Sequence, residues 1–261
     1  MSEIQRKKIL ITVMTYPHPS EPYKELICTA GITEDNNWIR LYPVDYRYQP
    51  AQKRFRKYQW IEVDLELQGS ENDNRLESRK PILETLRILG EPISAKNNWE
   101  ERRRIVDKMP HCSVNQLQQL YDRDKISLGI VRPKRVLDLI VEPTKEKWKP
   151  KWQYLFSQLH LFEKPQKPLR KLPFNFKYVF ECEDSTRPQQ ATILDWELGV
   201  LFLKESDKYG SDEAAAESVK NKFLNELCSS KKDTRFFMGT RFPYNLWMVL
   251  GVFWPPKTAG G

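Results

Sequence analysis

The sequence predicts an α+β protein in which helices flank a mainly antiparallel, strongly curved and barrel-like sheet. Three observations support this fold class. Apolar runs with strand character fill the first half of the chain, capping-box patterns open helical segments in the middle, and strands alternate with helical periodicity in the last third. The length of 261 residues, with 39% hydrophobic and 30% charged residues, suits one large or two small globular domains.

The first half of the chain reads as a meander of strands. Residues 8–15 are apolar on both faces, as expected of a central strand, and residues 25–32 form the next apolar run. A turn signal at 35–37 precedes a strand over 38–44. Residues 59–68 alternate between apolar and polar side chains, so this strand should bury one face and present an acidic face outward.

Helical signals follow in the middle of the chain. Asn98 and Glu101 stand at capping-box spacing before one helical run, and Ser113 and Gln116 repeat that spacing before another. Each pair predicts the start of a helix. Residues 127–143 return to strand character, with a break at a proline that a continuous strand would not accommodate.

Residues 144–173 differ from their surroundings because they are dense in lysine, proline and aromatic side chains. This composition predicts a linker or an extended arm, with a helical patch over Trp152–Phe162. We therefore expect an N-terminal strand-rich lobe over 1–143 and a C-terminal α+β lobe over 174–261. The arm could bind nucleic acid, or its tryptophans could dock on the protein body.

The C-terminal lobe begins with a predicted strand over 176–182. Helical periodicity covers 193–205 and, after a serine cap, 212–228. Two strands over 234–240 and 246–254 close the chain, and the short turn between them predicts a hairpin.

The net charge of +8 and the isoelectric point near 9.2 favour polyanionic partners, such as nucleic acid or an acidic membrane surface. No apolar run approaches the roughly 20 residues that a membrane-spanning helix needs. The start of the chain lacks a cleavage signal and reads as the beginning of a strand. We therefore expect a cytoplasmic protein without a membrane partner.

The most informative stretch begins at Trp38, where aromatic rings alternate with cations through to the next strand. On a strand, Trp38, Arg40 and Tyr42 share one face. If exposed, this face could stack on bases and hold phosphates. The alternative is a second, smaller core, in which Arg40 pairs with Glu62 or Asp64 on a neighbouring strand.

Further candidate contacts to nucleic acid lie in a basic turn and on a basic helix face. The turn joins two predicted strands, and its cations could contact phosphates. Alternatively, the turn is a solvated loop whose charges keep strand edges from pairing, and the helix face pairs its charges along the helix. The residues concerned are Lys53, Arg54, Arg56, Lys57, Tyr58, Arg102 and Arg103.

Asp195 and Glu197 are the best candidates for catalytic chemistry, because two nearby carboxylates can bind Mg²⁺ or act as acid and base. On one helix, however, residues two apart diverge by roughly 200° and should not reach one ion. A role at a helix start, where acidic groups are favourable, is the alternative. We expect no metal and no cofactor, except Mg²⁺ if the protein is a nuclease.

Six short phrases spread over most of the chain stand out together. They are W-I-R-L-Y-P (38–43), R-x-E-S (75–78), K-Y-x-F-x-C-x-D (177–184), D-W-E (195–197), F-x-G-T (237–240) and W-x-x-x-G-x-F-x-P-P (247–256). In these phrases the chain resembles uncharacterised bacterial proteins of mobile-element and phage-defence gene neighbourhoods. The resemblance implies a role connected with nucleic acid and names no reaction. Its polar residues to test are Arg40, Arg75, Glu77, Asp195 and Glu197.

Charge, motifs and resemblance favour a nucleic-acid-binding, non-catalytic component of a larger prokaryotic defence or mobile-element assembly, with protein partners. Two alternatives stay open. The first is a metal-dependent nuclease or hydrolase that uses Asp195 and Glu197. The second is a protein-interaction subunit whose aromatic surface docks a partner. The sequence leaves the choice between DNA and RNA open.

Overall fold

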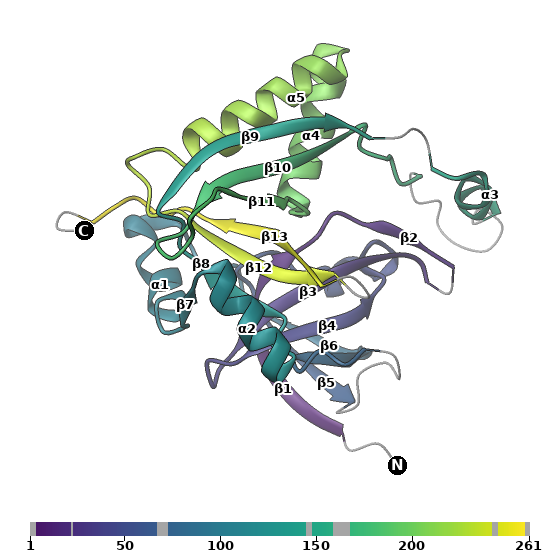
Figure 1. The fold of residues 1–261 in the computed structure, drawn as a ribbon. Helices are drawn as coiled ribbons and strands as arrows, with labels where there is room; N and C mark the ends of the chain where they lie inside the picture. Colours follow the sequence, from purple (N-terminus) through teal and green to yellow (C-terminus); the bar gives the residue numbers. More distant parts are fainter. Residues whose placement is uncertain are drawn as a thin grey trace.

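The computed structural model describes residues 4–21, 23–66, 73–144, 148–158, 168–241 and 245–258. It confirms the predicted fold class, because helices accompany three sheets in which antiparallel pairing predominates (Figure 1). None of the helices in these ranges has the length and apolar character of a membrane span.

The first sheet has six strands, and five of them form a closed ring. Its strands are β1 (Ile4–Met14), β2 (His18–Ser20), β3 (Lys24–Thr33), β4 (Trp38–Val44), β5 (Trp60–Glu66) and β6 (Ser78–Leu89), with short 3₁₀ helices η1 (Tyr46–Tyr48) and η2 (Ala51–Lys53) between β4 and β5. The order is β1-β5-β6-β4-β3-β2, and a further pairing of β1 with β3 closes the ring. Neighbours are antiparallel except β4 and β6.

Apolar side chains from the ring strands form a core of their own. Ile9, Ile11, Leu41, Ile61 and Val63 belong to it and are fully buried. Burial along β5 alternates strictly, as its sequence predicts. β6 lies outside the predicted strands, because its burial does not alternate and its register with β5 shifts partway along.

Two further sheets complete the molecule. The three-stranded sheet has the order β11-β10-β9, and the four-stranded sheet has the order β13-β12-β8-β7. Their strands are β7 (His111–Cys112), β8 (Leu128–Val131), β9 (Arg135–Pro143), β10 (Phe174–Glu181), β11 (Gln189–Thr192), β12 (Arg235–Arg241) and β13 (Leu246–Phe253). β8 and β9 confirm the predicted strand with a break, and the antiparallel pairing of β12 with β13 confirms the closing strand pair.

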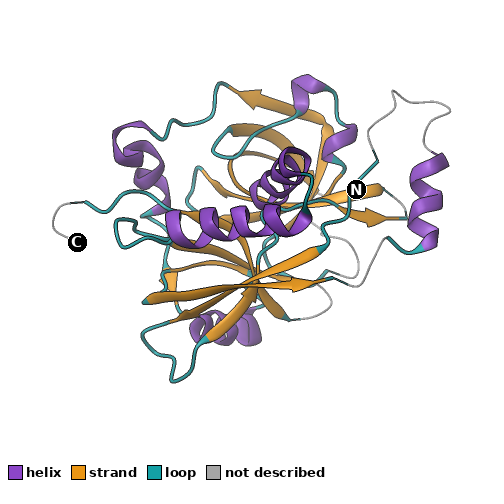
Figure 2. Cartoon of the chain, turned by 90° about the horizontal axis from the view of Figure 1, so that it is seen from above, coloured by secondary structure: helices purple, strands orange, loops and turns teal. Residues whose placement is uncertain are grey.

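Helices cover the three-stranded sheet and the sides of the molecule. The helices are α1 (Lys96–Val106), α2 (Val114–Asp124), α3 (Pro150–Gln158), α4 (Trp196–Tyr209) and α5 (Asp212–Lys220), followed by the π-helical turn η3 (Asn221–Glu226). Figures 1 and 2 show α4 and α5 lying across one face of β9–β11, while α3 stands apart from the body. Phe202, Ala215 and Val219 of these two helices pack with Phe176 and Phe180 of β10.

Strands that precede the predicted linker pair with strands that follow it. β9 precedes residues 144–173 and β10 follows them, yet the two strands are hydrogen-bonded neighbours. β8 likewise pairs with β12, so residues 128–143 lie in the same sheets as the C-terminal strands. The division into lobes stays a prediction. The predicted helical patch Trp152–Phe162 overlaps α3, and its last four residues lie outside the described residues.

The two predicted capping boxes have different outcomes. Ser113 accepts from the Gln116 backbone N–H, and the Gln116 side chain accepts from the Ser113 N–H, so this capping box is confirmed. The box at Asn98 is wrong. Asn97, Asn98 and Trp99 have positive φ angles of 51°, 53° and 63°, a left-handed conformation in which Asn98 does not cap the helix.

Candidate functional site

The predicted aromatic-basic face of β4 lies inside the molecule. Trp38 packs edge-on against Phe237 of β12, with 5.8 Å between ring centroids, and Arg40 is only 1% exposed. This part of the face is therefore the second core that the sequence left open. The expected partner was wrong, because Asp64 bonds to Arg6 on β1 instead of Arg40.

The basic turn is not an exposed loop tip. Lys53 donates to the backbone carbonyls of Leu83 and Glu84, and Arg54 donates to those of Gln49 and Arg47. These cations satisfy acceptors of their own fold, so they hold the turn against its neighbours. Arg56 is exposed as predicted, and it pairs with Glu91 at 2.5 Å.

Tyr58 is equally unavailable for base stacking. Tyr58 is 4% exposed, and the Arg102 guanidinium lies 3.9 Å from its ring centroid and 4.7 Å from that of Trp99. Burial raises the pKa of Tyr58 above its ordinary value. Arg103 donates to Asp233 and to the Pro256 carbonyl. Both arginines of the predicted helix face therefore have internal partners.

Lys57 joins the two candidate catalytic carboxylates. Its ammonium lies 3.0 Å and 3.2 Å from the carboxylate oxygens of Asp195 and 2.8 Å from Glu197. The expectation that these carboxylates cannot reach one cation was wrong, because Asp195 is the N-cap of α4 and has a non-helical backbone. Its side chain also accepts from the Glu197 N–H, so the predicted role at a helix start is confirmed.

Burial and charge act in opposite directions on this group of three. Burial alone would lower the pKa of Lys57, but the charges of Asp195 and Glu197 outweigh it and raise that pKa. For Asp195, which is 1% exposed, burial outweighs the nearby ammonium and raises the pKa. For Glu197, burial opposes ionisation, but Lys57 prevails and lowers the pKa. Lys57 is therefore a stable cation and a poor proton donor.

A second polar cluster connects the ring to the four-stranded sheet. Arg40 donates to the carbonyl and the hydroxyl of Ser127, at 3.1 Å and 3.2 Å. Glu77 accepts from the Ser127 N–H and hydroxyl, each at 2.8 Å. Arg75 bonds to Asp73 through two nitrogens and to the Thr240 carbonyl. Polar residues of three of the six phrases, 38–43, 75–78 and 237–240, thus meet in this cluster.

Two glycines lie close to these clusters. A Cβ on Gly239 would lie 2.4 Å from a methyl carbon of Leu250 and 3.1 Å from Arg40 Nη2. A Cβ on Gly251 would lie 3.6 Å from both Asp195 Oδ2 and Lys57 Nζ. The phrases around Gly239 and Gly251 therefore face the two polar clusters at close range.

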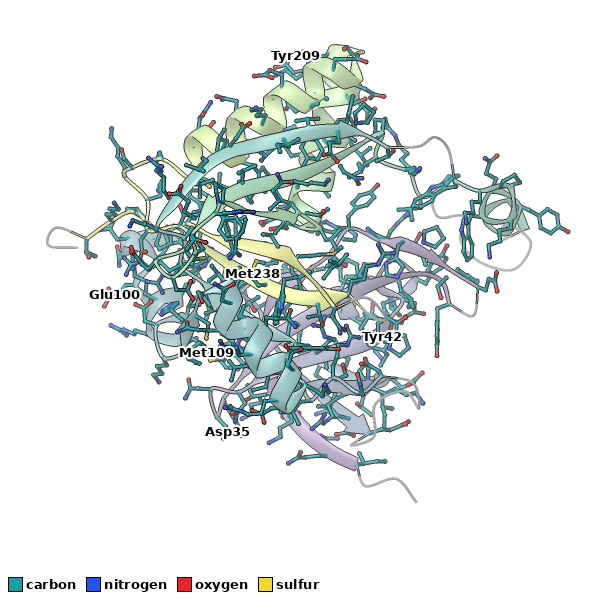
Figure 3. All side chains as sticks on the ribbon, in the orientation of Figure 1. Asp35, Tyr42, Glu100, Met109, Tyr209 and Met238 are labelled. Atoms are coloured by element: carbon teal, nitrogen blue, oxygen red, sulfur yellow. The ribbon has the colours of Figure 1, made fainter. Side chains whose placement is uncertain are left out.

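A cleft of about 490 Å³ lies between these two clusters. Residues from β2, β3, β4, β10, β12, β13 and α4 line it, so the ring and both other sheets contribute. Tyr42 lines it and is half-buried, and Figure 3 shows Tyr42 on the side of the molecule where α3 stands. A concave space of this size is typical of a ligand site.

The charges that line the cleft are predominantly positive. Among the described lining residues, the cations are Arg40, Arg75, Lys171 and Arg241, and the carboxylates are Asp73 and Asp195. Asp73 binds Arg75, and Asp195 binds Lys57 behind the wall. Arg241, at the exposed end of β12, has no ion pair within the ranges that the structure describes. Anionic ligands are therefore favoured over cationic ones.

Comparison with protein families assigns both parts of the chain. The model described as "Domain of unknown function (DUF8757)" matches residues 110–260, which is more than half of the chain. The chain belongs to this family. A second model, "Domain of unknown function (DUF8758)", matches residues 5–108, which include the closed ring and α1. The comparison with curated proteins gives no match.

The metal alternative finds limited support in the geometry. Within the described ranges, no three His, Cys, Asp or Glu side chains gather as a cation site. Both oxygens of Asp195 already face the Lys57 ammonium, so a divalent cation would have to displace a buried lysine.

Several cleft residues were not predicted as site residues. Lys171 lies in the predicted arm over 144–173 but was not named as a contact, and Arg241 directly follows the F-x-G-T phrase. Ser127, which bonds to Arg40 and is not among the lining residues, lies 87 residues from it in sequence. Of the predicted residues, Arg40, Tyr42 and Asp195 line the cleft. Arg75 was singled out by the resemblance alone and lines it too. Beyond β4, the carboxylate pattern thus identified Asp195 and the resemblance identified Arg75.

Proposed function

We propose that this chain binds nucleic acid in the cleft, as a non-catalytic component of a larger prokaryotic defence or mobile-element assembly. The observation that carries the proposal is the excess of cations over carboxylates in the cleft wall. The net charge of +8 acts in the same direction, because it draws polyanions towards the whole surface.

The size of the cleft favours an unpaired strand. Its volume of about 490 Å³ suits a ligand of roughly nucleotide size, and a double helix is too wide to enter it. A flipped base or a strand end is the part of a nucleic acid that fits. Arg241 at the exposed end of β12 is placed to contact the backbone that continues outside the cleft.

Aromatic rings in the wall supply a surface for bases. Tyr42 and Trp148 line the cleft, and the Trp148 indole N–H donates to the Leu169 carbonyl, which holds the ring in place. Stacking on such rings tolerates different bases and contributes about 1–3 kcal/mol per base. We therefore expect limited dependence on base sequence.

A titration with labelled oligonucleotides at increasing salt tests the proposal. We expect single-stranded DNA or RNA to bind more tightly than the matching duplex. The logarithm of the binding constant should fall with the logarithm of salt, by about 0.7 per phosphate contacted. Absence of binding to every form, or binding that does not respond to salt, would contradict the proposal.

A nuclease is the second candidate, because Asp195 lines the cleft and shares one cation position with Glu197. It predicts cleavage that depends on Mg²⁺ or Mn²⁺. Asp195→Asn keeps a helix cap of similar shape, so it should abolish such cleavage without unfolding the protein. Cleavage that survives this substitution would exclude the site.

The third candidate, a protein-interaction subunit, needs a different surface from the one predicted. Trp38 packs against Phe237 and Tyr58 is buried, so these two rings cannot dock a partner without unfolding. Copurification of a protein partner after nuclease treatment would favour this candidate.

A further inference from the structure

Arg40 keeps unused hydrogen-bonding capacity although it is buried. Its Nη2 donates to Ser127, but its Nη1 donates to the thiol of Cys28, at 2.8 Å. A thiol is a weak acceptor for a guanidinium. The Nε atom is buried and has no hydrogen-bond partner in the described structure. A guanidinium that lines a cleft in this state favours an anionic ligand.

No described carboxylate lies within ion-pair distance of the Arg40 guanidinium. Glu77 reaches it only through Ser127, which accepts from Arg40 and donates to Glu77. Nearby Arg75 is different, because Asp73 binds two of its nitrogens and the Thr240 carbonyl accepts from the third. Arg40 is therefore the cation of this cluster that can donate a hydrogen bond to a further partner.

Cys28 marks the approach to Arg40 from the cleft. It is half-buried, lines the cleft and contacts Nη1, whereas Ser127 occupies Nη2. Cys28 and Arg75 both line the cleft. An anion that enters here would replace the thiol with a stronger acceptor.

We propose that Arg40 binds a phosphate monoester, carried by the end of the nucleic-acid strand that enters the cleft. This inference rests on the proposed function. A terminal phosphate carries about −1.5 to −2 charges at pH 7, more than a phosphate inside a strand, and has three acceptor oxygens. It can accept from Nε or take the place of the thiol at Nη1. The cleft has room for about one nucleotide, so a strand end fits better than a continuing strand.

Strands that differ only at their ends test this proposal. Binding is compared for one single-stranded sequence with a 5′-phosphate, with a 3′-phosphate, with hydroxyl ends and as a closed circle. We expect one phosphate end to bind about tenfold more tightly than hydroxyl ends or the circle. Arg40→Gln should remove that difference. Arg104→Gln, which removes one charge from an exposed pair on α1, should keep it.

Alkylation of Cys28 gives a readout in the unmodified protein, in case Arg40→Gln does not fold. We expect the phosphate-ended strand to protect Cys28 from iodoacetamide, because both meet at Nη1. Labelling of Cys112, which lines a different cavity, should not change. If a mononucleotide protects Cys28 and the phosphate-ended strand does not, Arg40 still binds phosphate, and its ligand is a free nucleotide.

The failures of the two proposals can be told apart. Equal binding of all four strands, without protection of Cys28, would overturn the phosphate site and leave nucleic-acid binding intact. If no strand binds and no mononucleotide protects Cys28, both proposals fall.

Discussion

In the aromatic-basic stretch over 38–60, two of the cations are buried and bond inside the protein. Lys57 and Arg40 were predicted as surface contacts, but both lie inside and bond to residues far away in sequence. Their partners, Ser127 and Asp195, give no local sign of the pairing. The alternation of rings and cations that suggests a binding surface is therefore also what a core with internal charges looks like.

Removal of the Lys57 ammonium should destabilise the fold strongly. Lys57→Met leaves the Asp195 carboxylate buried without a cation, which costs about 3–5 kcal/mol of unfolding free energy. Urea denaturation measures this loss. Adding Asp195→Asn should recover more than half of it, because the unpaired charge is gone. Arg56→Gln, at an exposed pair, should cost less than about 1 kcal/mol.

The ion pair of Lys57 with Asp195 should also make the stability of the protein depend on pH. The pKa of Lys57 is higher in the folded state than its ordinary value of 10.5, so the folded state keeps this proton more strongly. The resulting stability is complete below pH 10.5 and is lost as the pH rises beyond it. The difference in unfolding free energy between the wild type and Lys57→Met should therefore shrink above that pH. A constant difference would contradict the raised pKa.

At the level of elements, the periodicity of apolar residues predicted strands more reliably than capping-box spacing predicted helix starts. Strict alternation predicted β5, and turn signals placed β4, because both depend on neighbours in sequence. β6 and β11 escaped prediction, since β6 does not alternate and β11 has only four residues. Asn98 has the spacing of a cap without its geometry, because the backbone there is left-handed and carries Trp99 into a buried cluster.

The contrast between the two capping boxes can be measured. Ser113→Ala removes a hydroxyl that caps α2 and should lower the unfolding free energy by about 1 kcal/mol. Glu101→Ala removes the partner in the box that does not form, so the free energy should change by only a few tenths of a kcal/mol. Equal losses would show that the box at Asn98 forms after all.

The close approach of β12 and β13 to the polar clusters gives another paired test. Gly239→Ala places a methyl group 2.4 Å from the nearest atom, a Leu250 methyl carbon, and should cost about 1–3 kcal/mol. Gly251→Ala meets its nearest atom at 3.3 Å, so its cost should stay below about 1 kcal/mol. Thermal unfolding of the two variants provides the comparison, and a larger loss for Gly251→Ala would contradict the packing described.

For the whole molecule, the fold class followed from the sequence, whereas of the candidate site only single residues such as Arg40, Tyr42 and Asp195 did. The cleft exists because the ring and two other sheets meet there, and that arrangement depends on pairings between distant strands. The net charge of +8 belongs to the entire chain and does not locate a site. Location requires knowing which cations are already paired inside the fold.

Whether nucleic acid binds at the cleft or at the basic turn is tested most directly by two matched substitutions. Arg241→Gln and Arg56→Gln each remove one exposed positive charge, the first at the cleft and the second at the turn. The affinity for a single strand is measured across a salt series for both variants and the wild type. We expect Arg241→Gln to weaken binding several-fold and to reduce the salt slope by about 0.7, with Arg56→Gln close to the wild type. A loss with Arg56→Gln that equals or exceeds the loss with Arg241→Gln would contradict binding in the cleft.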